Sequence, residues 1–370
     1  MLGMRTTVAV VNGPGQDFLF EEVDVDGPRA DEVVVRIIAS GICHTDLSLR
    51  EQLPAEMFPR VFGHEGAGVV EEVGAEVTGI EVGDHVVLSI ASCRSCDACR
   101  SGAVGYCDQA MMLNYMGFRM DGSTSYSRAS GPVFGHFLGQ SSLARHSVVH
   151  HSSVVVVDKD LDLTKVAPFG CGFQTGAGAI LNVARPGPGD SVVVYGVGAV
   201  GLAAIAAARA SDVETVIAVD LQPSRLEVAE KLGAIGVNPG ELGEVSVVDK
   251  IKEITGGGAA YGVETTAVPA VIKQAAQALR VRGTLVVLGL DMNHAEFAID
   301  AIDILQNGKI VRGSIEGDSD PLEMVPRMLR LHAEGKFPVT DLVTTYPFTE
   351  IDAAVADVLA GKVVKPVLVW

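Results

Sequence analysis

Positive charge is scarce in this chain of 370 residues: 28 lysines and arginines face 46 aspartates and glutamates, giving a formal net charge of −18. Nucleic acid requires a basic footprint, and an anionic membrane surface would repel this charge. No stretch reaches the roughly 18 apolar residues of a membrane span, and Met1–Asn12 shows no signal-peptide cleavage pattern. We therefore expect a cytoplasmic protein that binds neither nucleic acid nor membrane.

Apolar residues and glycine are plentiful by contrast. Hydrophobic residues make up 48% of the chain, and 42 residues are glycine. This composition is typical of a packed α/β enzyme and excludes disordered and fibrous proteins. The length is sufficient for two domains of ordinary size.

Four of the six cysteines lie close together, at Cys93, Cys96, Cys99 and Cys107. In a reducing compartment, clustered thiols bind metal more often than they form disulfides. Four thiolates complete a tetrahedral zinc shell without an open position, which makes such a site structural. An iron–sulfur cluster is the alternative, but its common spacings differ. The spacing therefore predicts a structural zinc lobe at residues 93–107.

The pattern of apolar residues in the sequence changes near residue 173. The preceding part is rich in β-branched runs such as residues 33–38, with glycine and proline between them. After it, the strand-like run 191–195, the small-residue helix 199–210 and the strand-like run 216–220 alternate. Alternating strands and helices predict a doubly wound parallel sheet of the α/β class.

A dinucleotide-binding loop is predicted where this second part begins. Gly196, Gly198 and Gly201 form a G-x-G-x-x-G between a strand and a helix, and Asp220 ends the next strand. The glycines allow a tight turn, close approach of a pyrophosphate and close packing of helix on strand. The helix N-terminus offers free N–H groups to the phosphates. Because Asp220 would bind the ribose hydroxyls and repel a 2′-phosphate, we expect NAD as the cofactor.

The other two cysteines and one histidine offer a second metal site. Cys43, His64 and Cys171 would supply two thiolates and one imidazole, a set that leaves a fourth zinc position open for water or substrate. A lone histidine in an apolar segment is more often a core residue than a ligand. Spacing alone leaves both interpretations open.

Together these motifs resemble the zinc-containing medium-chain alcohol dehydrogenases. The matching residues are Cys43-His44-Thr45-Asp46, Gly63-His64-Glu65 with Gly66, Gly68 and Gly74, the four-cysteine lobe, Cys171, and Gly196–Gly201 with Asp220. The resemblance implies a GroES-like, mostly β catalytic domain at 1–172 and 316–370 around a Rossmann domain at 173–315. It also implies that Cys43, His64 and Cys171 bind catalytic zinc, so that each chain holds two zinc ions.

The resemblance assigns roles to the neighbours of these ligands. Thr45 occupies the position of the hydroxyl that relays the alcohol proton, and Asp46 the position that orients the zinc histidine. Glu65 matches a carboxylate near zinc that is not a permanent ligand. Many relatives end the proton relay in a histidine at the position of Ser48, so here the proton is expected to leave from Thr45 through the ribose to water.

Three residues are implied to contact the anionic cofactor. His44 and Lys365 match positions that bind the pyrophosphate, and Arg225 matches a cation near the adenosine ribose. For Arg225 and Lys365, a solvated surface charge is the alternative.

Residues 139–142 and 169–179 resemble the aryl-alcohol and terpene-alcohol branch, which implies primary aryl or allylic alcohols as substrates and aldehydes as products. The implied substrate-pocket residues are Ser89, Met112, Phe137 and Leu138. Ser89 stands where ethanol-type relatives carry a large aromatic residue, although Phe137 and Leu138 could also simply fill the core.

Two other functions stay open at this point. A thiol-dependent formaldehyde dehydrogenase shares the motif at 43–46, but Met111 lies close to where the glutathione-type members carry arginine. A non-enzymatic zinc- and nucleotide-binding regulator would not need an open zinc site. The length of the segment from Met111 to Gly139 resembles that of dimeric members, so a homodimer is expected.

Overall fold

The computed structural model describes residues 4–289, 291 and 296–370. Residues 1–3, 290 and 292–295, which fall within the predicted domain ranges, lie outside the described part. The chain divides into two compact units. The first comprises residues 1–171, 320–326 and 343–370, and the second comprises 172–319 and 327–342. Residues 316–319 and 327–342 thus group with the second unit, whereas the predicted ranges placed them in the catalytic domain.

The first unit contains two largely antiparallel sheets. One has the order β4-β1-β2-β7-β8, and the other has the order β10-β6-β5-β3-β18-β17 with β9 paired to β3. The strands of this unit are β1 Met4–Val11, β2 Leu19–Val25, β3 Glu32–Gly41, β4 Arg60–Val61, β5 Glu65–Val73, β6 His85–Leu88, β7 Tyr126–Arg128, β8 Gly131–Val133, β9 His146–His150, β10 Val154–Val157, β17 Val343–Pro347 and β18 Lys365–Val369.

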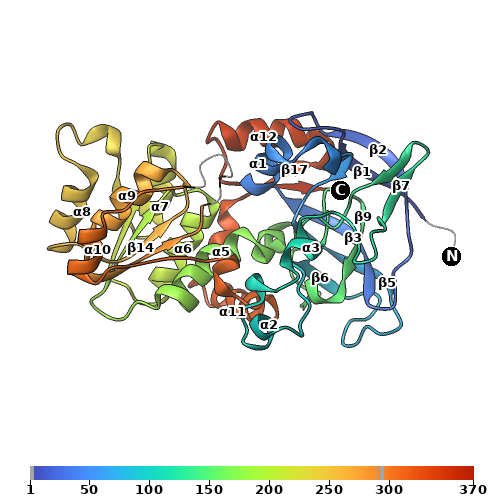
Figure 1. Ribbon diagram of the computed structural model, residues 1–370, viewed down its shortest axis with the longest axis horizontal. Helices are drawn as coiled ribbons and strands as arrows, with labels where there is room; N and C mark the ends of the chain where they lie inside the picture. The colour runs from blue at the N-terminus through green and yellow to red at the C-terminus, as the bar shows by residue number, and fades with distance from the viewer. Residues whose placement is uncertain (1–3, 290, 292–295) are drawn as a thin grey trace. The chain divides into compact units, whose positions relative to one another are not determined.

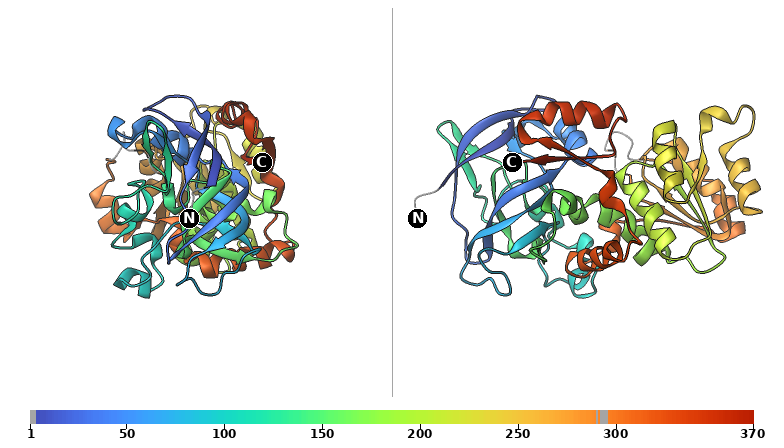
Figure 2. Two further views of the ribbon diagram at one scale, coloured as in Figure 1. Left: turned by 90° about the vertical axis from the view of Figure 1, so that its right-hand side faces the viewer. Right: turned by 180° about the vertical axis from the view of Figure 1, so that it is seen from behind.

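Both ends of the chain contribute to the second of these sheets. Strand β18 runs antiparallel to β3, with Val367 opposite Gly41, and Figure 2 shows this red C-terminal strand beside the blue N-terminal strands. The pairing carries Lys365 to the end of β3, beside the segment that holds Cys43. The helices of the first unit are α1 His44–Gln52, α2 Asp97–Arg100, α3 Ala110–Asn114, α4 Leu163–Val166 and α12 Ile351–Leu359.

The second unit is built on a parallel sheet of order β13-β12-β11-β14-β15-β16, with helices around it (Figure 1). Its strands are β11 Ser191–Tyr195, β12 Thr215–Val219, β13 Ile235–Val237, β14 Ala259–Glu264, β15 Leu279–Val287 and β16 Ile310–Gly313. Its helices are α5 Gly172–Gly178, the π-helical turns Ala179–Ala184, α6 Ala199–Ala210, α7 Pro223–Lys231, α8 Val247–Thr255, α9 Pro269–Gln277 and α10 Ala301–Asn307, while α11 Pro321–Ala333 belongs to both units.

The predicted doubly wound sheet is confirmed, and the strand at 191–195 and the helix at 199–210 lie where the sequence places them. Every residue of β11 is buried, as are Gly201–Ala208 of α6, because small apolar residues let this helix lie close against the sheet. The chain leaves β11 for β12 on one side, and β14 lies on the other side of β11. In open α/β sheets such a switch point, at the carboxyl ends of the strands, is where ligands bind.

Short 3₁₀ helices complete the fold, at Ala55–Met57, Val104–Tyr106, Phe137–Gly139, His151–Ser153, Ala167–Gly170, Pro239–Glu241, Glu316–Asp318, Val339–Leu342 and Phe348–Glu350. Among the described residues, no helix is long and apolar enough to cross a membrane.

Candidate metal centres and cofactor loop

The four clustered cysteines surround one point in the lobe. The Sγ atoms of Cys93, Cys96, Cys99 and Cys107 all lie within 4.8 Å of one another. Backbone N–H groups donate to three of the sulfurs: Cys96 N to Cys93 Sγ (3.4 Å), Cys99 N to Cys96 Sγ (3.5 Å) and Cys93 N to Cys107 Sγ (3.3 Å). Sulfurs that accept N–H bonds at this mutual distance match the donor set of a closed zinc shell.

The pKa values of these four thiols differ from one another. Hydrogen bonds from Ser95 lower the pKa of Cys93 to about 6. Burial raises the pKa of Cys99 to about 12. Four thiolates so close together repel one another, and a bound divalent cation removes that repulsion. The cluster is therefore a candidate structural zinc site.

A second cluster joins three segments that are distant in sequence. The ligand atoms of Cys43, His64 and Cys171 lie within 4.8 Å of one another. Cys43 is the N-cap of α1, His64 comes just before β5, and Cys171 follows the 3₁₀ turn at 167–170. The structure thus brings together the three residues implied by the family resemblance. Two thiolates and one imidazole leave a fourth position open, as a catalytic zinc site requires.

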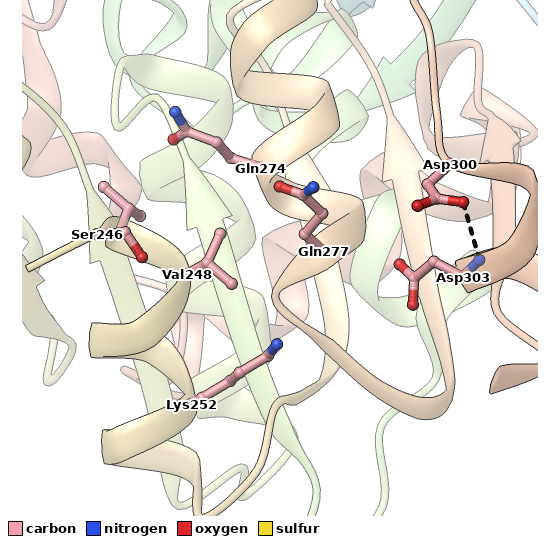
Figure 3. Close-up of a pocket in the computed structure, with 8 residues that line it drawn as sticks. Ser246, Val248, Lys252, Gln274, Gln277, Asp300 and Asp303 are labelled. Carbon is pink, nitrogen blue, oxygen red and sulfur yellow. Dashed lines mark hydrogen bonds between the residues drawn. The ribbon is translucent and has the colours of Figure 1, made fainter.

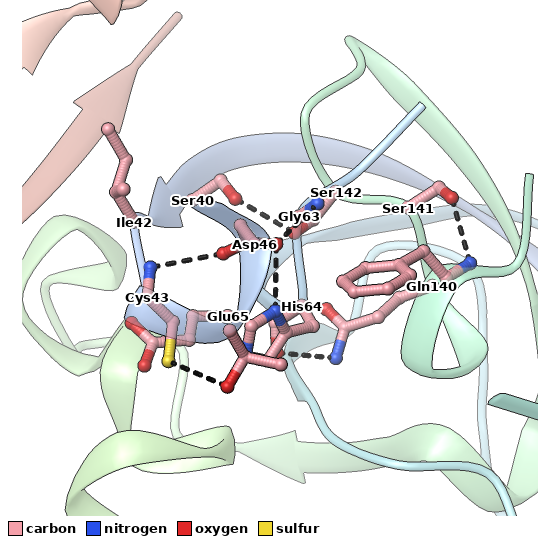
Figure 4. Close-up of polar contacts among 12 residues, drawn as sticks. Ser40, Ile42, Cys43, Asp46, Gly63, His64, Glu65, Gln140, Ser141 and Ser142 are labelled. Atoms are coloured by element: carbon pink, nitrogen blue, oxygen red, sulfur yellow. Dashed lines mark hydrogen bonds and ion pairs between the residues drawn. The ribbon is translucent and has the colours of Figure 1, made fainter. Parts of the chain in front are cut away.

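Asp46 connects two of these segments (Figure 4). Its Oδ2 accepts a bond from Cys43 N (3.0 Å), while its Oδ1 accepts bonds from Gly63 N (2.9 Å) and His64 Nδ1 (2.9 Å). Only 1% of Asp46 is exposed. The bond from Nδ1 leaves Nε2 of His64 buried without a hydrogen-bond partner among the described residues. An orphaned imidazole nitrogen aimed at two thiols fits a zinc ligand.

The electrostatics of the cluster favour a cation. A hydrogen bond from Cys171 lowers the pKa of Cys43 well below its usual range, which outweighs the opposing effect of burial, and His64 adds to this. Burial lowers the pKa of His64, but the charges of Asp46 and Cys43 outweigh burial and raise it well above its usual value. The site therefore already stabilises a thiolate beside a positive charge. Bound zinc would supply that positive charge in place of a proton.

The residues after Cys43 lie along α1. The Thr45 hydroxyl is 3.8 Å from Cys43 Sγ, so it stands next to the candidate zinc. His44 is exposed, and Ser48 is half-buried one turn further along the helix.

Glu65 and Lys365 form a buried ion pair near the same cluster. Lys365 Nζ donates to Glu65 Oε1 (2.8 Å) and Oε2 (2.9 Å), and also to the Ile42 carbonyl (3.2 Å). Burial raises the pKa of Glu65 although Lys365 opposes this, and the same pairing raises that of Lys365 against the effect of its burial. In this structure the ammonium of Lys365 is engaged by a carboxylate. Its predicted contact with a pyrophosphate stays a prediction.

The glycine loop has the geometry that a dinucleotide needs. Gly196 has φ +80°, a value that favours glycine, and a Cβ on Gly201 would lie 2.0 Å from the Gly196 carbonyl oxygen. Gly198, the N-cap of α6, has no side chain to occupy the helix N-terminus, and the space where a Cβ would be is open. The first and third glycines are thus required by the fold, whereas the space at the second is left for a ligand.

Asp220 lies beside this loop. Its carboxylate accepts bonds from Val197 N (2.8 Å) and Gln222 N (2.8 Å), and Arg225 lies 3.8 Å away. The carboxylate is therefore fixed next to the glycine turn, and its predicted bonds to the ribose hydroxyls stay a prediction.

Comparison with known proteins identifies the family. Residues 29–159 match the alcohol dehydrogenase GroES-like domain, and residues 199–334 match the zinc-binding dehydrogenase family. Geraniol dehydrogenase from Castellaniella defragrans is 40% identical over 364 residues, covering 98% of this chain and 97% of that protein. This chain belongs to the zinc-dependent medium-chain alcohol dehydrogenases. It is an enzyme of this class, as predicted, and its GroES-like and Rossmann folds are confirmed.

Solved structures of similar proteins support the assignment of this chain to the alcohol dehydrogenase family. An alcohol dehydrogenase zinc-binding domain protein from Burkholderia ambifaria is 42% identical, with a TM-score of 0.94. Benzyl alcohol dehydrogenase from Acinetobacter calcoaceticus is 38% identical, with a TM-score of 0.93. Each comparison covers 99% of this chain and 99% of the other.

The predicted substrate-pocket residues of the dehydrogenase have different surroundings. The Phe137 ring is buried and meets the His64 ring edge-on, with centroids 5.7 Å apart, and it also contacts Phe62. Leu138 is buried and Met112 is half-buried. Ser89 is fully buried, and its hydroxyl donates to the Gly170 carbonyl (2.6 Å). Of these residues, Phe137 thus contacts a candidate zinc ligand directly, while Ser89 bonds the residue before Cys171.

Some contacts of the site escaped the sequence analysis. The buried Gln140 bonds the backbone around His64. The sequence analysis used residues 139–142 only as a family likeness and predicted no such bonds. At the end of β14, the carboxylate of Glu264 accepts bonds from Thr266 N (2.6 Å) and Ala267 N (3.3 Å), while the Thr265 hydroxyl donates to Gly196 O (2.9 Å). An acidic residue ending a buried strand was the available signal for this support of the glycine loop.

A groove of about 680 Å³ lies between α8, α9 and α10 of the second unit (Figure 3). The residues that line it are Ser246, Val247, Val248, Lys252, Gln274, Gln277, Asp300 and Asp303. None of them was predicted as a site residue. Both charge signs occur in this lining, which points to no particular ligand.

Proposed function

We propose that this dehydrogenase oxidises bulky primary alcohols with an aryl or allylic group to aldehydes, reversibly and with NAD. The observation that carries the substrate class is the aromatic ring of Phe137, which borders the candidate catalytic zinc through its contact with His64. The similar proteins named for geraniol and for benzyl alcohol, an allylic and an aryl alcohol, support the same class. The Phe137 ring is fully buried, so it would shape the wall on which a flat unsaturated substrate lies and would not touch the substrate itself.

The residues of the site would divide the work as follows. Cys43, His64 and Cys171 would hold zinc, which when bound polarises the alcohol hydroxyl and lowers its pKa. Thr45, beside Cys43, would accept the hydroxyl proton and pass it toward solvent. Asp46 would keep the imidazole of His64 in the tautomer that presents Nε2.

NAD is proposed as the hydride acceptor because of the charge at Asp220. The carboxylate is fixed beside the glycine turn by two backbone N–H groups, so it cannot easily move away from a ribose. A 2′-phosphate in that place would meet a negative charge, whereas ribose hydroxyls would donate hydrogen bonds to it.

A substrate panel tests the proposal. NADH formation is followed at 340 nm with benzyl alcohol, geraniol, ethanol and a thiol–formaldehyde adduct. We expect a higher kcat/KM for benzyl alcohol and geraniol than for ethanol. A higher value for the thiol adduct would instead identify a formaldehyde dehydrogenase, and no turnover with any of the four would favour a binding protein.

Phe137→Leu adds a structural test, with Phe134→Leu as its matched control. Phe134 belongs to a separate ring pair with Phe118 in the same unit. We expect Phe137→Leu to raise KM for benzyl alcohol more than KM for ethanol, because the buried ring supports a pocket wall that the larger substrate contacts over a greater area. Equal effects of the two variants would contradict the assigned role of Phe137.

We also propose a homodimer that forms through the edge of the parallel sheet. Strand β16 is the last strand of this sheet in the described part of the chain, and Ile310 on it is 53% exposed. Leu305, on the neighbouring α10, is 81% exposed. An open edge with apolar side chains is a typical surface for pairing with a second copy.

Light scattering after size-exclusion chromatography tests the dimer. We expect Leu305→Lys to shift the enzyme toward monomer. Leu359→Lys, at an exposed leucine of α12 in the other unit, should leave the mass unchanged. A wild-type enzyme that elutes as a monomer would overturn the proposal.

A further inference from the structure

The side chain of Gln140 is buried beside His64 and makes three hydrogen bonds, all to backbone atoms. Its Nε2 donates to the His64 carbonyl (2.8 Å) and to the Ser89 carbonyl (3.3 Å). Its Oε1 accepts a bond from Gly66 N (3.0 Å). One amide thus bonds the residues on both sides of Glu65 and also the segment that holds Ser89. Figure 4 shows Gln140 beside His64.

The two residues after Gln140 fix the same stretch of chain. The Ser141 hydroxyl donates to the Val61 carbonyl (2.7 Å), and Ser142 N donates to the Gly63 carbonyl (2.9 Å). Ser141 and Ser142 are fully buried. Residues 61–66 are therefore bound along their length by residues 140–142.

The close approach explains a glycine in the motif. A Cβ on Gly66 would lie 2.7 Å from Ser142 Cβ and 3.0 Å from Gln140 Oε1. Gly63 has φ +94°, and a Cβ there would lie 2.4 Å from Leu143 N. Both glycines let residues 140–143 lie against the backbone on each side of His64.

The amide of Gln140 is also connected by hydrogen bonds to the segment that holds Cys171, the third candidate ligand. Gln140 bonds the Ser89 carbonyl, the Ser89 hydroxyl donates to the Gly170 carbonyl (2.6 Å), and Gly170 precedes Cys171. A continuous path of buried hydrogen bonds therefore runs from the backbone of His64 through Gln140 and Ser89 to the residue before Cys171.

We propose that Gln140 is a positioning residue of the catalytic metal site, which sets the separation of the His64 and Cys171 ligand atoms through this path. The inference rests on the proposed zinc site of Cys43, His64 and Cys171. Asp46 fixes the ring of His64, and Gln140 fixes its backbone. Partners behind metal ligands typically change metal affinity or activity 10–100-fold when removed.

The choice of an amide is chemically specific. The position needs one acceptor, for Gly66 N, and two donors, for the carbonyls of His64 and Ser89. Glutamate could accept from Gly66 N, but its second oxygen would face two carbonyl oxygens. Methionine has a similar length and makes none of the three bonds. Gln140→Glu and Gln140→Met therefore separate the loss of the donors from the loss of all three bonds.

Asn114 offers a matched control, because its amide bonds in the same pattern. Its Oδ1 accepts from Ala91 N (2.9 Å), and its Nδ2 donates to the carbonyls of Ala91 (2.9 Å) and Ala110 (3.0 Å). Asn114 is buried to a similar degree. Asn114→Leu removes three equivalent bonds without touching residues 61–66 or Gly170.

The test uses the full-length enzyme with Co²⁺ exchanged into the catalytic site. The visible absorption bands of Co²⁺ report ligand geometry, and release of the metal to a chelator reports its retention. We expect both Gln140 variants to shift the bands and to release the metal 10–100-fold faster, with a lower kcat and an unchanged KM for NAD. Asn114→Leu should lower the melting temperature but leave the spectrum as in the parent enzyme.

Two results would overturn the inference. One is an unchanged spectrum and release rate in Gln140 variants that melt like Asn114→Leu, and the other is an altered spectrum in Asn114→Leu itself. If the Gln140 variants do not fold, Ser89→Ala tests the next link of the path, and an unchanged spectrum there would count equally against the proposal. Absence of thiolate-to-cobalt absorption in the parent enzyme would instead refute the zinc site.

Discussion

Asp46→Asn is the substitution that most sharply tests how the catalytic metal site is held. The carboxylate accepts three hydrogen bonds, from Cys43 N, Gly63 N and His64 Nδ1, all between 2.9 and 3.0 Å. Asparagine has the same shape but carries one NH₂ group. Since all three partners are donors, either orientation of the amide must place its NH₂ group against at least one of them.

The less costly orientation of the amide turns its oxygen toward Gly63 N and His64 Nδ1 and its NH₂ group toward Cys43 N. One buried N–H then loses its acceptor, which costs about 1–3 kcal/mol, and the other two bonds lose the strength that a charged acceptor gives. A tenfold change in an equilibrium corresponds to about 1.4 kcal/mol. We therefore expect zinc to be held roughly 10- to 100-fold less tightly, the range typical of residues behind metal ligands.

The assay is the rate at which a chromogenic chelator removes zinc, measured together with kcat. Asp249→Asn is the matched control, because Asp249 holds the equivalent third position of α8 and receives a bond from the Ser246 hydroxyl (2.7 Å). We expect this control to behave like the parent enzyme. Zinc release and kcat within twofold of the parent in Asp46→Asn would refute the reasoning.

Three further predictions follow from other parts of the chain. Cys43→Ser should abolish turnover in a folded protein that still binds NADH, whereas Cys96→Ser should lower the melting temperature first; equal zinc loss and equal destabilisation in both would contradict two distinct sites. Asp220→Gly should reduce the preference for NAD over NADP, chiefly by raising KM for NAD; an unchanged ratio of kcat/KM values would refute it. Burial lowers the pKa of His136 to about 4 from 6.5, so the unfolded chain takes up the proton first as pH falls, and about 2 kcal/mol of stability present at pH 8 should be lost at pH 5. His136→Asn, a residue that tolerates the φ of +54° there, should flatten this difference in chemical unfolding, and an equal slope would exclude His136 as its source.

Short-range patterns of the sequence predicted the fold well, and the reason is physical. The run at 191–195 is buried on both faces, so its apolar character needs no knowledge of distant residues. The four-cysteine lobe closes within one short segment, and its local N–H···S bonds come from the same residues. In both cases the partners of each residue lie close to it in sequence.

Contacts between distant segments were not accessible in this way. Lys365 and Glu65 are 300 residues apart, and the pairing of β18 with β3 brings them together. Family likeness implied roles for each residue separately, but not that one would neutralise the other. Ser89 was predicted as a pocket residue from its position in the family resemblance, whereas its hydroxyl has a specific acceptor in the Gly170 carbonyl that no spacing rule indicates.

The ion pair of Lys365 bears on how an acidic enzyme can hold an anionic cofactor. With a net charge of −18, few cations oppose the average field, and Lys365 already shares its charge with Glu65. Arg225 likewise faces Asp220 at 3.8 Å. Backbone N–H groups at the start of α6 do not depend on side-chain charge, and Gly198 leaves them open. Helix geometry, more than a surplus of cations, is therefore the feature of this chain best suited to bind the pyrophosphate.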